Sequence, residues 1–191
     1  MKQTITIIIL VLTFGLQSAM AQKKEITETF SNYIEATKSD NLEEQLKFFH
    51  PQLFIFFPKD TFLLALEMIK ANPMVKVGNE RLISISEVYI ENGSQYALLT
   101  FNQEMSMNMS NMKNQGGSDY AISLMIDDFK RQYGEENVNF DEKLYKVEIM
   151  MTNEFYAIFD PKLKTWKFLP KDEDSKSIIE QIVPEKIRQK I

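Results

Sequence analysis

The sequence contains a single histidine, His50, whose side chain is the only one with an ordinary pKa near neutrality. As a general acid or base, it would need a pocket and a second polar group within hydrogen-bond reach. His50 follows a short apolar stripe of helical spacing and precedes Pro51, a position where an imidazole caps the terminal carbonyls of a helix. We therefore expect a structural role for His50 and keep acid–base catalysis as the alternative.

Methionines occupy alternate positions in one segment, at Met105, Met107 and Met109, and Met112 follows closely. Thioether sulfurs are soft ligands that can hold Cu(I) in an exported protein. The same parity also includes three apolar residues upstream: Ala97, Leu99 and Phe101. Because methionine fills irregular cores well, the pattern favours the inward face of a strand over a copper site.

Carboxylates occur in pairs at Glu43-Glu44, Asp127-Asp128 and Glu135-Glu136. Catalysis by paired carboxylates needs two acids that converge from different elements, whereas these pairs fall at helix starts or opposite apolar stripes. The acidic cluster at 172–174 lacks the glycine and the terminal glutamate of a calcium loop. We expect solvated charge at these positions, and neither a cofactor nor a metal.

Several classes of protein are excluded by what the sequence lacks. It has no cysteine, so disulfides, thiolate metal sites and cysteine nucleophiles are ruled out. It also lacks the nucleophile elbow of serine hydrolases and the glycine-rich loops of nucleotide-binding proteins. The formal net charge is −5, with lysines interleaved among acidic residues. Since phosphate binding needs a clustered basic face, we expect no nucleic-acid partner.

The first 21 residues have the three parts of a secretory signal peptide. Lys2 is followed by an apolar run from Ile5 to Leu16 and then by Ala19-Met20-Ala21. This run is shorter than the roughly 20 residues that span a bilayer. We predict cleavage between Ala21 and Gln22, export to the periplasm or beyond the cell, and no stable membrane anchor after cleavage.

Periodicity predicts helices at the start, middle and end of the remaining chain. The expected helices lie near 25–38, 59–71 and 120–133, with a terminal helical segment over 175–191 that breaks at Pro184. Asp40 and Glu43 have the spacing of a capping box for a further short helix, with Leu42, Leu46 and Phe49 as its stripe. The apolar run Leu53–Phe57 predicts a brief buried strand.

From Pro73 to Pro170 the pattern is mostly one of alternation, which predicts a curved antiparallel sheet. The inward parity changes near Ser86-Glu87, which indicates a bulge. Asn92-Gly93 predicts a tight hairpin turn, because both residues tolerate positive φ. We expect the long strand after this turn to be buried on one side only.

Helices followed by a strongly bent antiparallel sheet resemble the NTF2-like fold, the α+β cone of nuclear transport factor 2, ketosteroid isomerases and many exported bacterial proteins. The resemblance is carried by Thr37–Leu42, Phe49-His50-Pro51 and Thr165–Phe168. It covers about 25–170, interrupted by 110–139. No residue matches the catalytic carboxylate and oxyanion donors of ketosteroid isomerases.

The resemblance implies a single α+β domain over 22–191, with N-terminal helices packed on a strongly curved sheet. Members of this fold hold ligands in the open mouth of the cone, which the inserted helix or the C-terminal helix could cover. The expected ligand-contacting side chains are Phe101, Met105, Met107, Tyr145, Tyr156 and Trp166.

Three hypotheses about function follow. The leading one is an exported, non-enzymatic domain that binds a small apolar ligand or a protein partner on the concave sheet. The alternative is a lyase or isomerase that uses His50 or a cavity carboxylate. The third is a structural protein that forms a homodimer through its sheet.

Overall fold

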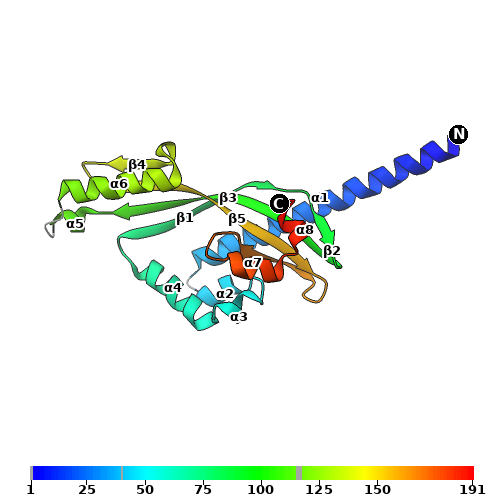
Figure 1. Ribbon diagram of the computed structural model, residues 1–191, viewed down its shortest axis with the longest axis horizontal. Coiled ribbons are helices and arrows are strands. Elements are labelled where there is room, and N and C mark those ends of the chain that lie inside the picture. Colours follow the sequence, from blue (N-terminus) through cyan, green and yellow to red (C-terminus); the bar gives the residue numbers. More distant parts are fainter. Residues whose placement is uncertain (1, 40, 115–117) are drawn as a thin grey trace. The chain divides into compact units, whose positions relative to one another are not determined.

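The computed structural model describes residues 2–39, 41–114 and 118–191, with side chains from Met20 onward except that of Asn114 (Figure 1). The chain is α+β, and its six strands form one antiparallel sheet that does not close on itself. The strand order is β1-β3-β5-β4, while β2 also pairs with β3 and β6 with β5. The strands are β1 (Val75–Ile85), β2 (Tyr89–Glu91), β3 (Ser94–Asn108), β4 (Val138–Asp141), β5 (Lys146–Asp160) and β6 (Thr165–Pro170). This confirms the α+β class and the antiparallel sheet.

The helices lie before, between and after the strands in sequence. They include the helix predicted near 120–133 and the terminal helical segment predicted over 175–191. They are α1 (Lys2–Lys38), α2 (Leu42–Leu46), α3 (Leu53–Phe56), α4 (Lys59–Ala71), α5 (Ser110–Asn114), α6 (Asp119–Tyr133), α7 (Lys176–Ile182) and α8 (Glu185–Arg188), with a 3-10 turn η1 (Glu135–Asn137). Within the part of the chain that the structure describes, no helix combines the length and the apolar character needed to cross a membrane.

The chain forms two compact units, and β1, β3 and β5 contribute to both. Unit 1 comprises Met1–Phe56, Ser84–Leu99 and Glu154–Ile191. Unit 2 comprises Phe57–Ile83 and Thr100–Asn153. Each unit has its own buried residues.

The core of unit 1 is a cluster of aromatic rings between α1 and the sheet. Phe168 is fully buried on β6, with its ring stacked on Phe155 at 5.5 Å and meeting the edge of Phe30 at 6.0 Å. Tyr33 makes further edge contacts with Phe49 and Phe155 at 5.8 Å each. The stripe predicted near 25–38 is therefore the face that α1 buries.

The core of unit 2 lies between α6 and one face of the sheet. Ile122 and Ile126 of α6 are 2% and 5% exposed, and Val147 and Ile149 of β5 are 0% and 1% exposed. Met109, which directly follows β3, is fully buried in the same cluster. The helix begins at Ser118, whose hydroxyl accepts the Ala121 N–H, and ends at Gly134, whose φ is +94°. Sequence periodicity thus located the helix that covers the methionines.

The structure around α2 bears on two of the local predictions. Asp40 lies outside the described residues; the N-cap is Asn41, whose side-chain oxygen accepts the Glu44 N–H at 3.3 Å. The buried strand predicted over Leu53–Phe57 is wrong, because Leu53–Phe56 forms the short helix α3. Only Leu53 of this helix is buried, and Ile55 is 74% exposed. An apolar run this short does not distinguish a strand from one helical turn.

The hairpins follow from turn chemistry. Asn92 and Gly93 have φ of +52° and +79°, which confirms the predicted turn between β2 and β3. The expected bulge at Ser86-Glu87 is instead the break between β1 and β2. The β4–β5 and β5–β6 turns have the same local hydrogen bond, in which an aspartate Oδ1 accepts the backbone N–H of the residue two positions later. Asp141 accepts from Lys143 at 2.9 Å, and Asp160 accepts from Lys162 at 2.7 Å.

Candidate functional site

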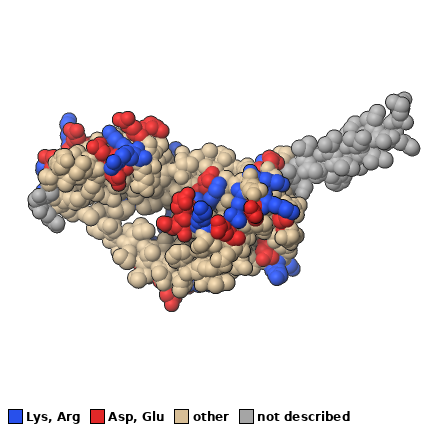
Figure 2. Space-filling view, in the orientation of Figure 1, with Lys and Arg blue, Asp and Glu red and all other residues tan. Residues whose placement is uncertain are grey.

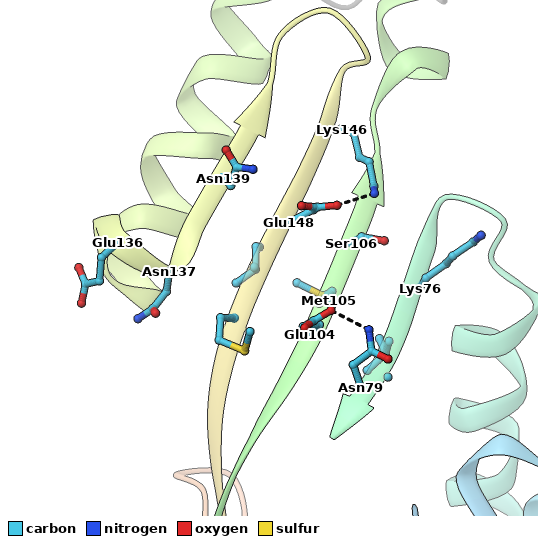
Figure 3. Close-up of a pocket in the computed structure, with 14 residues that line it drawn as sticks. Lys76, Asn79, Glu104, Met105, Ser106, Glu136, Asn137, Asn139, Lys146 and Glu148 are labelled. Atoms are coloured by element: carbon cyan, nitrogen blue, oxygen red, sulfur yellow. Dashed lines mark hydrogen bonds and ion pairs between the residues drawn. The ribbon is translucent and has the colours of Figure 1, made fainter. Parts of the chain in front are cut away.

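The candidate site is a groove on the sheet of unit 2, with a cavity volume of about 610 Å³. We call it the polar groove. Figure 3 shows that its side chains come from β1, β3, β5, β4 and the turn η1. The polar side chains along it are Lys76, Asn79, Glu104, Ser106, Glu136, Asn137, Asn139, Lys146 and Glu148. Its volume lies within the ~300–1,000 Å³ typical of ligand sites.

Strand alternation produces this groove. Successive side chains of a strand point to opposite faces, so burying Val147 and Ile149 places Lys146 and Glu148 on the other face. The same rule applies to β3, where Glu104 and Ser106 line the groove between methionines that pack against the core cluster. The sheet of unit 2 therefore has a methionine face under α6 and a polar face along the groove, which carries most of the polar side chains. The groove lining also includes four apolar side chains: Val77, Met105, Ile149 and Met150.

Hydrogen bonds and ion pairs order the side chains of the polar face. Asn79 Nδ2 donates to Glu104 Oε2 at 2.7 Å, and the Lys146 ammonium lies 2.6 Å from the Glu148 carboxylate, as the dashed lines in Figure 3 mark. Asn139 lies directly opposite Glu148 across the β4–β5 ladder. Asn79 has a φ of +56°, a left-handed conformation that asparagine adopts more readily than most residues.

These groups can recognise a polar ligand. Amides both donate and accept hydrogen bonds, so Asn79, Asn137 and Asn139 can match peptide groups or hydroxyls. The charges include both signs. Figure 2 likewise shows acidic and basic side chains interspersed rather than sorted into patches of one sign. Among the described residues, no group of three histidine, aspartate or glutamate side chains could hold a metal ion.

Four of the predicted ligand residues lie in unit 2. Phe101 is 2% exposed, and Met105 and Met107 pack against the core cluster, with Met105 also contributing to the groove lining. Tyr145 packs against the same cluster, and its hydroxyl donates to Asp119 Oδ1 at 3.1 Å. The Lys113 ammonium, 2.5 Å away, and then the hydrogen bond from Tyr145 hold the pKa of Asp119 below its usual range.

The other two lie in unit 1. Trp166 is 2% exposed, and its indole N–H donates to Glu25 Oε2 at 3.1 Å, which links β6 to α1. Tyr156 is also 2% exposed, and its hydroxyl donates to the carbonyl of Ile191 at 3.3 Å. The predicted set is thus divided between the two units rather than gathered within one of them.

His50 lies in unit 1, 6% exposed, beside an isolated parallel bridge between Phe49 and Phe168. Its backbone N–H donates to the carbonyl of Phe168 at 2.8 Å. Its Nδ1 is buried, with no hydrogen-bond partner among the described residues, so this nitrogen does not cap a helix. Burial lowers the pKa of His50 below 6.5; Asp160 opposes this shift and Lys167 adds to it.

Sequence reasoning missed the groove residues themselves. It predicted that the long strand, now β3, is buried on one side only, and it gave no role to the other side, where Glu104 and Ser106 lie. The strand β4, which contributes Asn139, was also not predicted. A signal was present in the amides and paired charges that alternate with apolar residues in both β3 and β5.

The chain matches no family model, no curated protein and no solved structure.

Proposed function

We propose that the chain is an exported, non-enzymatic binding domain with an NTF2-like arrangement, and that a protein partner binds along the polar groove. The observation that carries this proposal is the chemical difference between the two faces of the unit 2 sheet. The methionine face is occupied by α6, whereas the polar face has a groove in which amides and charges of both signs stand beside a few apolar side chains. Export rests on the signal-like first 21 residues.

A protein partner suits the groove better than a small apolar molecule. An apolar molecule would desolvate Glu104, Lys146 and the neighbouring amides without replacing their hydrogen bonds, which is costly. A polypeptide segment carries an N–H donor and a C=O acceptor at nearly every residue. The asparagine amides can satisfy both kinds of group, and the charged side chains can pair with charges on the partner.

The NTF2-like arrangement is supported by the order of the elements and by the packing within unit 1. Helices precede an antiparallel sheet, and the edge contact between Phe30 and Phe168 sets α1 against β6. Trp166 and Phe168, which carry part of the resemblance, are both buried in that unit.

Exchanging the charges of Lys146 and Glu148 should weaken partner binding by about tenfold, because partner charges paired with this face meet like charges. The double variant K146E/E148K keeps the net charge and the ion pair. Since exposed ion pairs add little to stability, the fold should be unaffected. The measurement is affinity for peptides selected from a phage-displayed random library on residues 22–191.

The matched control is D128R/R131D on α6, which exchanges an ion pair of similar geometry, 2.9 Å apart and largely exposed. This variant should bind the selected peptides as tightly as the original protein. Failure to recover any binding peptide would contradict the proposal. The proposal would also be contradicted if the selected peptides bound D128R/R131D more weakly than the original protein but bound K146E/E148K equally well.

A further inference from the structure

Helix α4 of unit 2, which precedes β1 in Figure 1, turns an apolar face toward solvent. None of its 13 residues is buried, and Leu64 and Met68 are 57% and 66% exposed. The half-buried side chains of the helix, those of Phe62, Leu63 and Leu66, lie on the opposite face. A helix of this length is marginal in water without tertiary packing. The solvent-facing side of α4 is therefore a surface that a further helix or another apolar partner could cover.

The exposed residues of this face have the spacing of a coiled coil. They are Phe57, just before the helix, and Thr61, Leu64, Met68 and Ala71 within it, and all five are exposed. We call this set the α4 seam. Its alternating steps of four and three positions are those of the a and d residues that interlock with a second helix. A seam this narrow fits another helix better than a membrane surface, which is covered by a wider apolar face.

The charges beside the seam favour a second copy of the same helix in parallel orientation. Asp60 and Glu67 flank the seam on one side, whereas Ala65 lies on the other side. In a parallel pair the acidic flank of each helix faces the uncharged flank of its partner. In an antiparallel pair the two acidic flanks would face each other, and like charges on neighbouring helix positions repel. Two copies of α4 are therefore complementary when they run side by side in the same direction.

We propose that two copies of the chain associate through the α4 seam as a parallel, symmetric pair of helices. The same patch is used on both protomers, as a two-fold axis requires. Two helices of this length bury less than the ~1,600 Å² of a standard interface, so the dissociation constant should be weak, on the order of 100 µM. The seam shares no residue with the polar groove, so this inference is independent of the proposed peptide binding.

Sedimentation equilibrium of residues 22–191, from about 1 µM to about 1 mM, tests the association. The original protein should pass from monomer to dimer over this range. Met68→Glu should weaken the dimer by about tenfold or more, because it buries an unpaired charge in the seam. The matched control is Ile69→Glu, which adds the same charge at the next position, 50% exposed but off the seam. This control should keep the dissociation constant within about twofold.

A gain of affinity is expected from Thr61→Ile. It replaces a hydroxyl at an a position with an apolar β-branched side chain, the type that favours two-stranded coiled coils. The dimer should tighten by about tenfold, because the added apolar surface is removed from water in both protomers. The substitution lies at an exposed position of the monomer, so the fold of each protomer should be unaffected.

Crosslinking tests the orientation, since the chain contains no cysteine of its own. In a parallel pair, equivalent seam positions face each other, so Thr61→Cys and Met68→Cys should each form an intermolecular disulfide under mild oxidation. An antiparallel pair could crosslink at one of these positions but not at both, because its two-fold axis passes the seam at a single place. Ile69→Cys, off the seam, should not crosslink.

Peroxide oxidation of Met68 gives a readout that needs no variant. At micromolar concentration the chain is monomeric and Met68 should react as an exposed residue, whereas at about 1 mM the dimer should slow its oxidation severalfold. The rate at Met150, which lines the polar groove, should not depend on protein concentration.

Several results would overturn the proposal. They are a monomer throughout the concentration range, equal weakening by Met68→Glu and Ile69→Glu, and crosslinking at Ile69→Cys as fast as at Met68→Cys. A protein that stays monomeric but binds phosphatidylcholine vesicles, and loses this binding in Met68→Glu, would show that the seam faces lipid instead.

Discussion

Replacing Phe168 with alanine is expected to lower the free energy of unfolding by about 3–5 kcal/mol, the range for truncating a buried aromatic side chain. Phe168 is fully buried and contacts Phe30, Tyr33 and Phe155. Removing its ring leaves a cavity among the remaining rings, which are held in place by α1 and β5. Urea unfolding monitored by the fluorescence of Trp166, the only tryptophan, measures this loss within unit 1.

The matched control is Phe56→Ala, which removes the same side chain at a position that is 40% exposed. It should lower the free energy of unfolding by no more than about 1 kcal/mol, because less apolar area returns to water. Equal losses for the two variants would mean that the aromatic cluster does not form the core of unit 1.

Truncating Ile122 to alanine is expected to lower the local stability of unit 2 by about 2–5 kcal/mol. Ile122 is 2% exposed and belongs to the cluster that joins α6 to Met109, Val147 and Ile149. Because alanine has the higher helix propensity, a loss reflects packing rather than a weaker helix. Hydrogen exchange at the backbone amides of 146–149 reports local opening, which should become roughly 30-fold or more faster for a 2 kcal/mol loss.

Leu124→Ala provides the control on the same helix, since Leu124 is 49% exposed. Exchange over 146–149 should remain within about twofold of the original rate, as expected for a surface substitution. If the Ile122 variant also stays within that range, α6 does not stabilise the methionine face.

Much of the fold could be predicted because periodicity and turn chemistry are local. Apolar spacing at Ile26, Phe30 and Tyr33 predicted the helix near 25–38, which is the C-terminal part of α1 (Lys2–Lys38). Asn92-Gly93 predicted the hairpin turn that precedes β3. The secondary structure of Leu53–Phe56 was predicted wrongly, because four apolar residues are compatible with a strand and with a helical turn equally well. The helix predicted near 59–71 is α4, but periodicity did not show that this helix buries none of its residues; Ile69, for example, is 50% exposed.

The candidate sites could be predicted less well, because both depend on contacts between distant segments. Asn79 and Glu104 are 25 positions apart, and nothing in either segment alone indicates their hydrogen bond. His50 and Asp160 line one small cavity of unit 1, and they are brought together by the pairing of Phe49 with Phe168 and of β5 with β6. Sequence alone identified His50 as chemically notable but could not supply its neighbours.

Peroxide oxidation of residues 22–191, mapped by mass spectrometry, tests most directly whether the methionine face is buried and the polar face open. Oxidation follows exposure. Met68 is 66% exposed and should react first, Met150 in the groove should follow, and Met109, which is fully buried, should react last. Oxidation of Met109 as fast as that of Met68 would contradict the assignment of the two faces.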